Sequence, residues 1–352
     1  MIGRIRSLRA PRRGPALVSC CLALVVGLAV SGCGGSGGSG QTLTLYNAQH
    51  EETTDALITA FTAQTGIKVR VKSDDEDVLT AQLEQEGSRS PADVFYTENS
   101  NWLEQLDQRG LLAKVDSSTL ANVPRRDSAS NGEWLGVSGR FSVLVYNPSK
   151  ISASQLPTSV LGLANPKYKG MLELAPAETD FWPIITSVAR AKGQAAALSW
   201  LRGLKANAGS NDDAPDNETL LSDVSNGRAA LGVINHYYYY RLRAEIGASA
   251  VHAKLSLFAP RDPGYVEDIS GAAILKSSKH VAEAQRFLAF ITSTAGQRVL
   301  ARGTSFEYPL ARHVAANPQL PPADKLQPNS ITPAEIGTGL DARNLLREAG
   351  LI

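Results

Sequence analysis

The pattern that most constrains the fold is a strand, a helix and a second strand in direct succession. Residues 42–46 alternate polar and apolar side chains, as a half-buried strand does. Residues 51–64 place Leu57 and Phe61 on one apolar stripe with helical spacing, and residues 67–71 alternate again. A strand–helix–strand unit favours parallel strands joined by a right-handed crossover. We therefore expect an α/β sheet that begins at this unit.

Strands and helices continue to alternate along the chain. Further strands are expected at 92–96, 142–146, 229–234 and 269–275, and helices at 79–85, 102–109, 181–192, 194–204, 220–226, 281–292, 294–301 and 341–348. No repeat of 20–50 residues occurs. The 312 residues after Gly40 are long for one domain, so we expect α/β structure throughout, with two sheets.

The first 33 residues resemble the signal peptide of a bacterial lipoprotein. Five arginines precede a mainly apolar run at 16–30, which is short for a membrane span. Val30-Ser31-Gly32-Cys33 resembles a lipobox, which implies cleavage before Cys33 and a diacylglycerol on its thiol. An ordinary secretory signal is the alternative, and both predict export. Residues 34–40 are only Gly and Ser and are expected to form a flexible tether.

Cysteine content and charge exclude several classes of protein. Cys20 and Cys21 lie in the expected signal and Cys33 would carry lipid, so the exported body has no disulfide and no thiolate zinc site. Without the five arginines of the signal, 30 basic residues remain against 34 acidic ones, a net charge of about −4. Such a body has no basic footprint for nucleic acid.

Four consecutive tyrosines, Tyr237 to Tyr240, are unusual in a chain with only 10 tyrosines among 352 residues. A phenol has a pKa of about 10 and is a poor ligand at neutral pH. A highly charged hard cation can displace the proton and bind the phenolate, so paired tyrosines point to ferric iron. The alternative is an aromatic cluster that packs in a core or lines a sugar groove.

His50, Glu98 and Tyr237 each lie within a few residues after a predicted strand. In open parallel sheets, ligands bind beyond the carboxyl ends of the strands. We therefore expect these three side chains to converge on one cleft. Taken singly, His50 is also typical of a hydrogen-bonded loop residue, and Glu98 of an acid that favours a helix N-terminus.

Four separated segments occur in the order and spacing of a known family. They are Leu45-Tyr46-Asn47-Ala48-Gln49-His50, Pro91-Ala92-Asp93-Val94-Phe95-Tyr96-Thr97-Glu98, Ser138-Gly139-Arg140 and Asn235-His236-Tyr237-Tyr238. Together with Ser270 to Lys276 and Glu307 to Leu310, they resemble the periplasmic ferric-ion-binding proteins, the bacterial transferrins of ABC-type iron importers. The resemblance runs from about Thr42 to the C-terminus.

The resemblance implies the type II periplasmic-binding-protein fold. In this architecture two α/β lobes are joined by crossing strands, and the ligand lies between them. The implied N-terminal lobe contains residues 41–141 and 270–318, and the C-terminal lobe contains 142–269 and 319–352.

Residue by residue, the resemblance also implies that His50, Glu98, Tyr237 and Tyr238 are ligands of ferric iron. Two phenolates and one carboxylate supply three negative charges against a 3+ ion, and neutral imidazole adds a fourth donor. Hard oxygen donors suit a hard cation, and six-coordination leaves two positions for an anion or water. The next two tyrosines match no ligand position and are expected to pack or to lie at the rim.

The chain departs from the family pattern where many relatives hold a synergistic anion, often phosphate or carbonate. Those relatives use Ser-Gly-Ala at a helix start, where free N–H groups suit anions. Here Glu178, Thr179 and Asp180 occupy these positions, and two carboxylates would repel phosphate. Either Thr179 or Asp180 caps the helix that follows, or a carboxylate replaces the anion or binds the metal. Further candidates for anion or outer contacts are Asn99, Arg140, Asn217 and Asn235.

These observations favour a non-enzymatic binding protein that captures ferric iron outside the cytoplasmic membrane and delivers it to an ABC permease. We expect a monomer that is anchored to the membrane by lipid on Cys33. A two-lobed receptor for a small organic cation or a sugar is the first alternative. A lipid-anchored hydrolase that pairs Glu98 with Asp180 or Glu178 is the second. No motif supports the hydrolase, since the one Gly-x-Ser-x-Gly match, at 34–38, lies in the tether.

Overall fold

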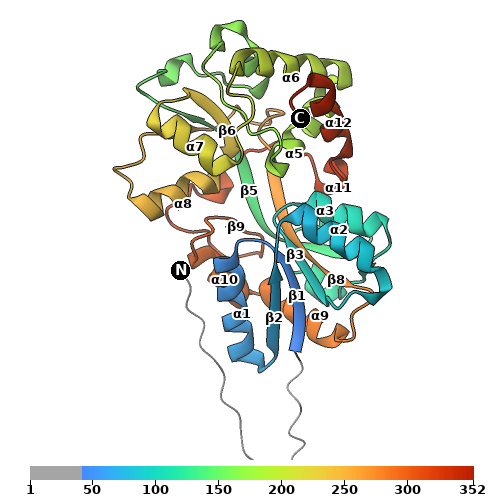
Figure 1. The fold of residues 1–352 in the computed structure, drawn as a ribbon. Helices are drawn as coiled ribbons and strands as arrows, with labels where there is room; N and C mark the ends of the chain where they lie inside the picture. The colour runs from blue at the N-terminus through green and yellow to red at the C-terminus, as the bar shows by residue number, and fades with distance from the viewer. Residues whose placement is uncertain (1–41) are drawn as a thin grey trace, which may run out of the picture. The chain divides into compact units, whose positions relative to one another are not determined.

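The computed structural model describes residues 42–352, which form α-helices and β-strands arranged in two sheets (Figure 1). The expected signal peptide, the lipidation site Cys33 and the tether at 34–40 lie outside the described residues. Within the described residues, no helix has the length and apolar character needed to cross a membrane.

The elements follow the expected α/β alternation. The strands are β1 (Thr42–Ala48), β2 (Lys68–Ser73), β3 (Val94–Thr97), β4 (Leu112–Ala113), β5 (Trp134–Tyr146), β6 (Leu231–Asn235), β7 (Lys254–Ser256), β8 (Glu267–Leu275) and β9 (Tyr308–Pro309). The α-helices are α1 (Glu51–Thr65), α2 (Glu76–Glu86), α3 (Ser100–Gln108), α4 (Ser117–Leu120), α5 (Trp182–Lys192), α6 (Gln194–Ala208), α7 (Asn217–Asn226), α8 (His236–Ile246), α9 (Val281–Ile291), α10 (Thr294–Arg302), α11 (Pro333–Ile336) and α12 (Leu340–Ala349).

The first sheet has the strand order β2–β1–β3–β8–β5. β1 pairs in parallel with both β2 and β3, whereas β8 runs antiparallel to β3 and to β5. The parallel pairing confirms the prediction made from the strand–helix–strand unit. α1 ends where Gly66 adopts a φ of 73°, a left-handed conformation that glycine tolerates best.

The side chains of alternate β1 residues point to opposite faces of this sheet. Leu43 and Leu45 lie in one apolar cluster with Phe61 of α1 and with residues of α9 and α10. Tyr46 lies in a second cluster, which includes residues of α2 and α3 and continues into the second half of the protein. Because helices cover both faces, β1 and β3 are buried on both sides, whereas the edge strand β2 stays largely exposed. Phe61 is fully buried, and its truncation to Ala is expected to destabilise the fold by about 3–5 kcal/mol.

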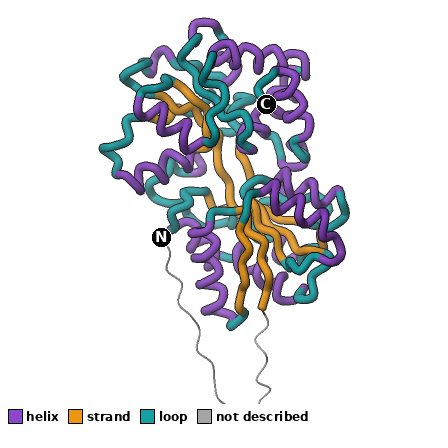
Figure 2. Tube along the Cα trace, viewed as in Figure 1, coloured by secondary structure: helices purple, strands orange, loops and turns teal. Residues whose placement is uncertain are grey.

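β5 joins the two sheets, as the long strand between them shows (Figure 2). Its residues 134–141 pair with β8 of the first sheet, and residues 142–146 pair with β6 of the second. The prediction covered only 142–146. Gly136 interrupts the preceding stretch, and a Cβ at this position would lie 2.3 Å from the Asp127 carbonyl oxygen. Close backbone approach therefore requires glycine here, and the glycine obscures the strand pattern.

The second sheet contains the end of β5 with β6 and β7, all antiparallel. α7 packs on β6, α5 packs on α6, and the C-terminal helix α12 returns to α5 and α6. We name the part built on the first sheet the first lobe and the part built on the second sheet the second lobe. We propose lobe boundaries of 41–141 with 270–318 for the first lobe and 142–269 with 319–352 for the second.

Candidate functional site

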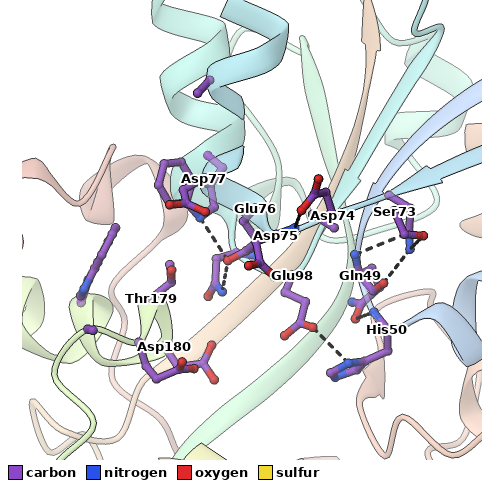
Figure 3. Close-up of a pocket in the computed structure, with 18 of the residues that line it drawn as sticks. Gln49, His50, Ser73, Asp74, Asp75, Glu76, Asp77, Glu98, Thr179 and Asp180 are labelled. Atoms are coloured by element: carbon purple, nitrogen blue, oxygen red, sulfur yellow. Dashed lines mark hydrogen bonds and ion pairs between the residues drawn. The ribbon is translucent and has the colours of Figure 1, made fainter. Parts of the chain in front are cut away.

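A cleft of about 980 Å³ lies where β1 and β3 end and where α3, α5 and α8 begin (Figure 3). Both lobes contribute to its walls. Of the residues that line it, nine are Asp or Glu, and Arg343 is the one Lys or Arg. The acidic residues are Glu51, Asp74, Asp75, Glu76, Asp77, Glu98, Glu178, Asp180 and Glu218. A cleft walled by one sign of charge concentrates ions of the opposite sign, so this one attracts cations.

His50 and Glu98 enter the cleft from the first lobe. His50 lies between β1 and α1, and Glu98 directly follows β3. Because β1 and β3 are parallel neighbours, their carboxyl ends meet at one edge of the sheet. His50 Nδ1 lies 3.1 Å from Glu98 Oε1 (Figure 3). The two side chains therefore meet as the strand positions predicted.

Tyr237 and Tyr238 enter from the second lobe, in the first turn of α8, which starts directly after β6. Both are buried, and their rings are stacked with centroids 4.1 Å apart. The Tyr237 hydroxyl donates to Glu98 Oε2 at 3.2 Å, and the Tyr238 hydroxyl donates to Asp180 Oδ2 at 3.0 Å. The structure thus brings the two tyrosines to His50 and Glu98, with Asp180 beside them.

Burial sets the proton positions in this cluster. Burial, and then the charge of Glu98, raises the pKa of Tyr237, and burial with Asp180 raises the pKa of Tyr238. Burial also raises the pKa of Glu98, although Arg140 opposes the shift. In the structure without a metal, both phenols therefore keep their protons. A bound cation would displace those protons and replace the hydrogen bonds that they form.

The imidazole of His50 is neutral. Burial, followed by the charges of Arg241 and Arg140, lowers its pKa well below the usual value. Arg241 Nη1, from α8, lies 2.8 Å from the ring nitrogens of His50. A neutral imidazole is the form that binds metal ions.

Arg140 is a fully buried counter-charge on the crossing strand β5. It donates to Asn99 Oδ1 at 2.7 Å and to Glu307 at 3.2 Å, and it lies 3.5 Å from Asp180 and from Asp268. Burial alone would lower the pKa of Arg140, but the surrounding carboxylates outweigh burial and raise it. One guanidinium therefore links an asparagine of the first lobe to an aspartate of the second.

Neither Thr179 nor Asp180 caps a helix, so the capping interpretation is wrong. A short 3-10 turn at Thr179–Phe181 leads into α5, and neither N-cap position has a side-chain capping hydrogen bond. Asp180 instead lines the cleft (Figure 3). Its Oδ2 accepts hydrogen bonds from Tyr238 and, at 3.4 Å, from Asn217. Asn217 also donates to Glu178 at 3.3 Å. Burial, and then the charge of Asp180, raises the pKa of Glu178 to about 8.

Asn235 ends β6 beside the tyrosines, and its side-chain Nδ2 has no hydrogen-bond partner within residues 42–352. Both ring nitrogens of His236 are already hydrogen-bonded, one to the Phe141 N–H at 3.1 Å and the other to the Phe306 carbonyl oxygen at 2.9 Å, so His236 is not free to bind a metal. Tyr240 stacks on Phe306, with ring centroids 5.9 Å apart. Thus, among residues 42–352, Asn235 keeps an unpaired buried donor, while Tyr240 packs against Phe306.

Sequence reasoning missed several residues of the cleft. Glu76 accepts hydrogen bonds from the segment around Glu98, and Trp102 of the first lobe meets Trp182 of the second with ring centroids 5.8 Å apart. No short-range pattern indicates either contact. Arg241 follows Tyr237 by four residues, a spacing that places both on one helix face and that could have revealed it.

Within residues 42–352, no group of three or more His, Cys, Asp or Glu side chains is arranged to hold a metal ion. The donors brought together are phenol, carboxyl and imidazole, which suit a hard, highly charged cation better than a soft one.

The fold and the cleft define a bacterial extracellular solute-binding protein, and the model of that family matches residues 89–330. The "Fe(3+)-binding periplasmic protein" of Serratia marcescens is 39% identical over 312 residues, which cover 89% of this chain and 91% of the relative. The "Major ferric iron-binding protein" of Neisseria meningitidis serogroup B is 39% identical over 311 residues, covering 88% and 93%.

A solved structure supports the same grouping. The iron-bound HitA of Pseudomonas aeruginosa superposes with a TM-score of 0.84 at 41% identity, covering 88% of this chain and 99% of that one. The chain belongs to the periplasmic ferric-ion-binding protein family and has its type II, two-lobed fold. The family consists of binding proteins, so the protein is not an enzyme and the hydrolase alternative is dropped.

Proposed function

We propose that this protein binds ferric iron in the cleft between its lobes and serves as the substrate-binding component of an ABC-type importer. The observation that carries the proposal is the meeting of His50 and Glu98 with Tyr237 and Tyr238 across the cleft. Relatives with matching length that are named for ferric iron support the same ligand.

The donor set matches the charge of the ion. When iron displaces the two phenol protons, two phenolates and the Glu98 carboxylate balance a 3+ ion, and neutral His50 supplies a fourth donor. Burial of Tyr237 and Tyr238 limits the water that would weaken the contacts of their oxygens.

We further propose that Asp180 stands in for the synergistic anion, phosphate or carbonate, that the family resemblance implies. Its carboxylate already accepts from Tyr238 and Asn217 and lies 3.5 Å from Arg140. Asn99, Glu178 and Thr179 line the same cleft as Asp180. A separate phosphate would meet two carboxylates at this place, which makes it unfavourable.

The mechanism follows from the origin of the ligands. One pair belongs to the first lobe and the other to the second, so the ion holds the lobes together when they close around it. Protons compete with the metal for phenolate and carboxylate, and acid therefore promotes release. The closed, loaded form is the one presented to the permease.

The proposed location is extracytoplasmic, with a lipid on Cys33 as the membrane anchor and a monomeric body. Substitution of Cys33→Ala is expected to move the protein from the detergent phase to the aqueous phase on partitioning. An unchanged distribution would contradict the anchor without affecting the iron proposal.

The experiment that tests iron binding loads the purified protein with ferric citrate, removes excess by desalting, and records the visible spectrum with an iron assay. We expect a phenolate-to-iron band and about one iron per chain, because the site offers one set of ligands. Loading without added phosphate or carbonate is expected, and Asp180→Asn should make loading depend on either anion. A colourless protein without iron would favour the organic-cation or sugar receptor instead.

A further inference from the structure

Glu76 makes an unusual set of contacts beside the proposed iron site. It lies in the first turn of α2 and lines the cleft next to Glu98 (Figure 3). Its Oε1 accepts from Thr97 Oγ1 at 2.5 Å and from the Asn99 backbone N–H at 2.7 Å. Its Oε2 accepts from Asn99 Nδ2 at 2.9 Å and from Trp102 Nε1 at 3.1 Å. All four groups, which belong to three residues, are donors, so Glu76 acts as an acceptor through both oxygens.

The donors lie on both sides of Glu98. Thr97 precedes it at the end of β3, and Asn99 follows it at the start of α3. Glu76 therefore holds the chain immediately before and immediately after the proposed ligand. Hydrogen bonds to a charged acceptor are about twice as strong as neutral ones, so this clamp restrains the backbone of Glu98.

The same carboxylate also reaches the contacts between the lobes. Trp102, which donates to Glu76, meets Trp182 of the second lobe at a ring-centroid distance of 5.8 Å. Asn99 accepts from Arg140, which in turn lies 3.5 Å from Asp180. Glu76 is thus connected to the second lobe by two separate routes.

We propose that Glu76 is a positioning residue that holds Glu98 in the orientation required for coordination and holds Trp102 in place for lobe closure. This inference rests on the proposed function. The contacts of Glu98 with His50 and Tyr237 depend on the direction of a short segment between β3 and α3. Partners that orient a metal ligand without touching the metal strongly affect affinity.

A simpler explanation is that Glu76 only adds negative charge near a cation or at the N-terminus of α2. Asp77 separates the two explanations, because it lies in the same turn and lines the same cleft. Its carboxylate accepts only from the adjacent Val78 N–H among the hydrogen bonds recorded for residues 42–352. Asp77→Asn therefore removes the same charge without releasing the segment around Glu98.

The test measures iron affinity of the full protein by competition with citrate in four variants: Glu76→Gln, Asp77→Asn, Glu98→Gln and the double variant Glu76→Gln/Glu98→Gln. We expect Glu76→Gln to weaken binding by roughly 10- to 100-fold while the phenolate band remains, because the tyrosines are untouched. Asp77→Asn should weaken it by no more than about 3-fold, as expected for an exposed charge.

The iron affinity of the double variant distinguishes a positioning role of Glu76 from a general effect on the fold. If Glu76 acts through Glu98, its substitution should have little further effect once Glu98 is Gln. Equal losses for Glu76→Gln and Asp77→Asn, or full additivity in the double variant, would overturn the inference. Thr97→Val, which removes one donor and keeps the shape, should give a smaller loss in the same direction if Glu76→Gln fails to fold.

Failure of the two proposals can be told apart. A wild-type protein without iron and without colour contradicts the iron proposal itself. A coloured wild type whose affinity is unchanged by Glu76→Gln and by Thr97→Val contradicts only the role of Glu76.

Discussion

The two lobes hold their sides of the cleft in different ways. On the first lobe, Glu98 lies in a short segment that is clamped by the hydrogen bonds of Glu76. On the second lobe, Tyr237 and Tyr238 are held by burial and by stacking in the first turn of a helix. The first side is thus ordered by hydrogen bonds to a carboxylate, whereas the second combines ring packing with one hydrogen bond from each tyrosine hydroxyl to a carboxylate. The difference predicts different consequences when each side is altered.

The largest effect is expected from the second lobe. The double substitution Tyr237→Phe/Tyr238→Phe keeps the stacked rings but removes both oxygens, so the visible band should vanish. Iron affinity should fall by more than the roughly 100-fold that loss of an outer partner causes. Spectroscopy and an iron assay check this, and Tyr239→Phe serves as the matched control with colour retained.

His50→Gln sharpens the same comparison from the first lobe. It removes one neutral donor and leaves both phenols, so we expect weaker iron binding with the band still present. Loss of colour in His50→Gln, or retained colour in the tyrosine double variant, would contradict the assignment of the visible band to the two tyrosines.

The next effect concerns pH. Burial raises the pKa of Tyr237 and Tyr238, so the empty protein holds both phenol protons and the loaded protein holds neither. Binding therefore releases protons, and affinity should fall by roughly 100-fold for each unit of decreasing pH, since two protons are exchanged. Iron retention measured from pH 8 to pH 5 checks the slope. An affinity independent of pH would contradict phenolate ligation.

A smaller effect, on stability and not on colour, is expected where the lobes meet at Arg140. Arg140→Met leaves buried carboxylates without their counter-charge and should destabilise the metal-free protein by about 3–5 kcal/mol. Urea unfolding measures this change. Arg190→Ala is the control, because its ion pair with Glu335 is exposed and is worth at most about 1 kcal/mol. Similar losses in both variants would show that burial of Arg140 does not matter.

Sequence patterns predicted the local elements well where periodicity was clear. The parallel pairing of β1 with β2 follows from the strand–helix–strand pattern of residues 42–71. The first half of β5 was missed because its glycines break the alternation that marks a strand. Helix α8 was missed because four aromatic residues carry only a modest preference for helix.

In the cleft, too, local sequence patterns predicted some contacts and not others. His50 and Glu98 were expected to meet because parallel strands place their carboxyl ends together. Asp180 was left with two interpretations, and contacts from Tyr238 and Asn217 removed the capping one. These contacts join residues 37 or more positions apart, which no local pattern encodes.

The amino-acid sequence by itself determined the α/β class, the family resemblance and the chemical types of donor, because these depend on local periodicity and on the identity of side chains. Only the tertiary structure decided that Glu76 binds the residues on both sides of Glu98, that Arg140 connects the lobes and that Trp102 meets Trp182. These contacts arise when β5 crosses between two sheets and brings distant segments together. Their partners are chosen by packing in space, and packing is a property of the folded chain as a whole.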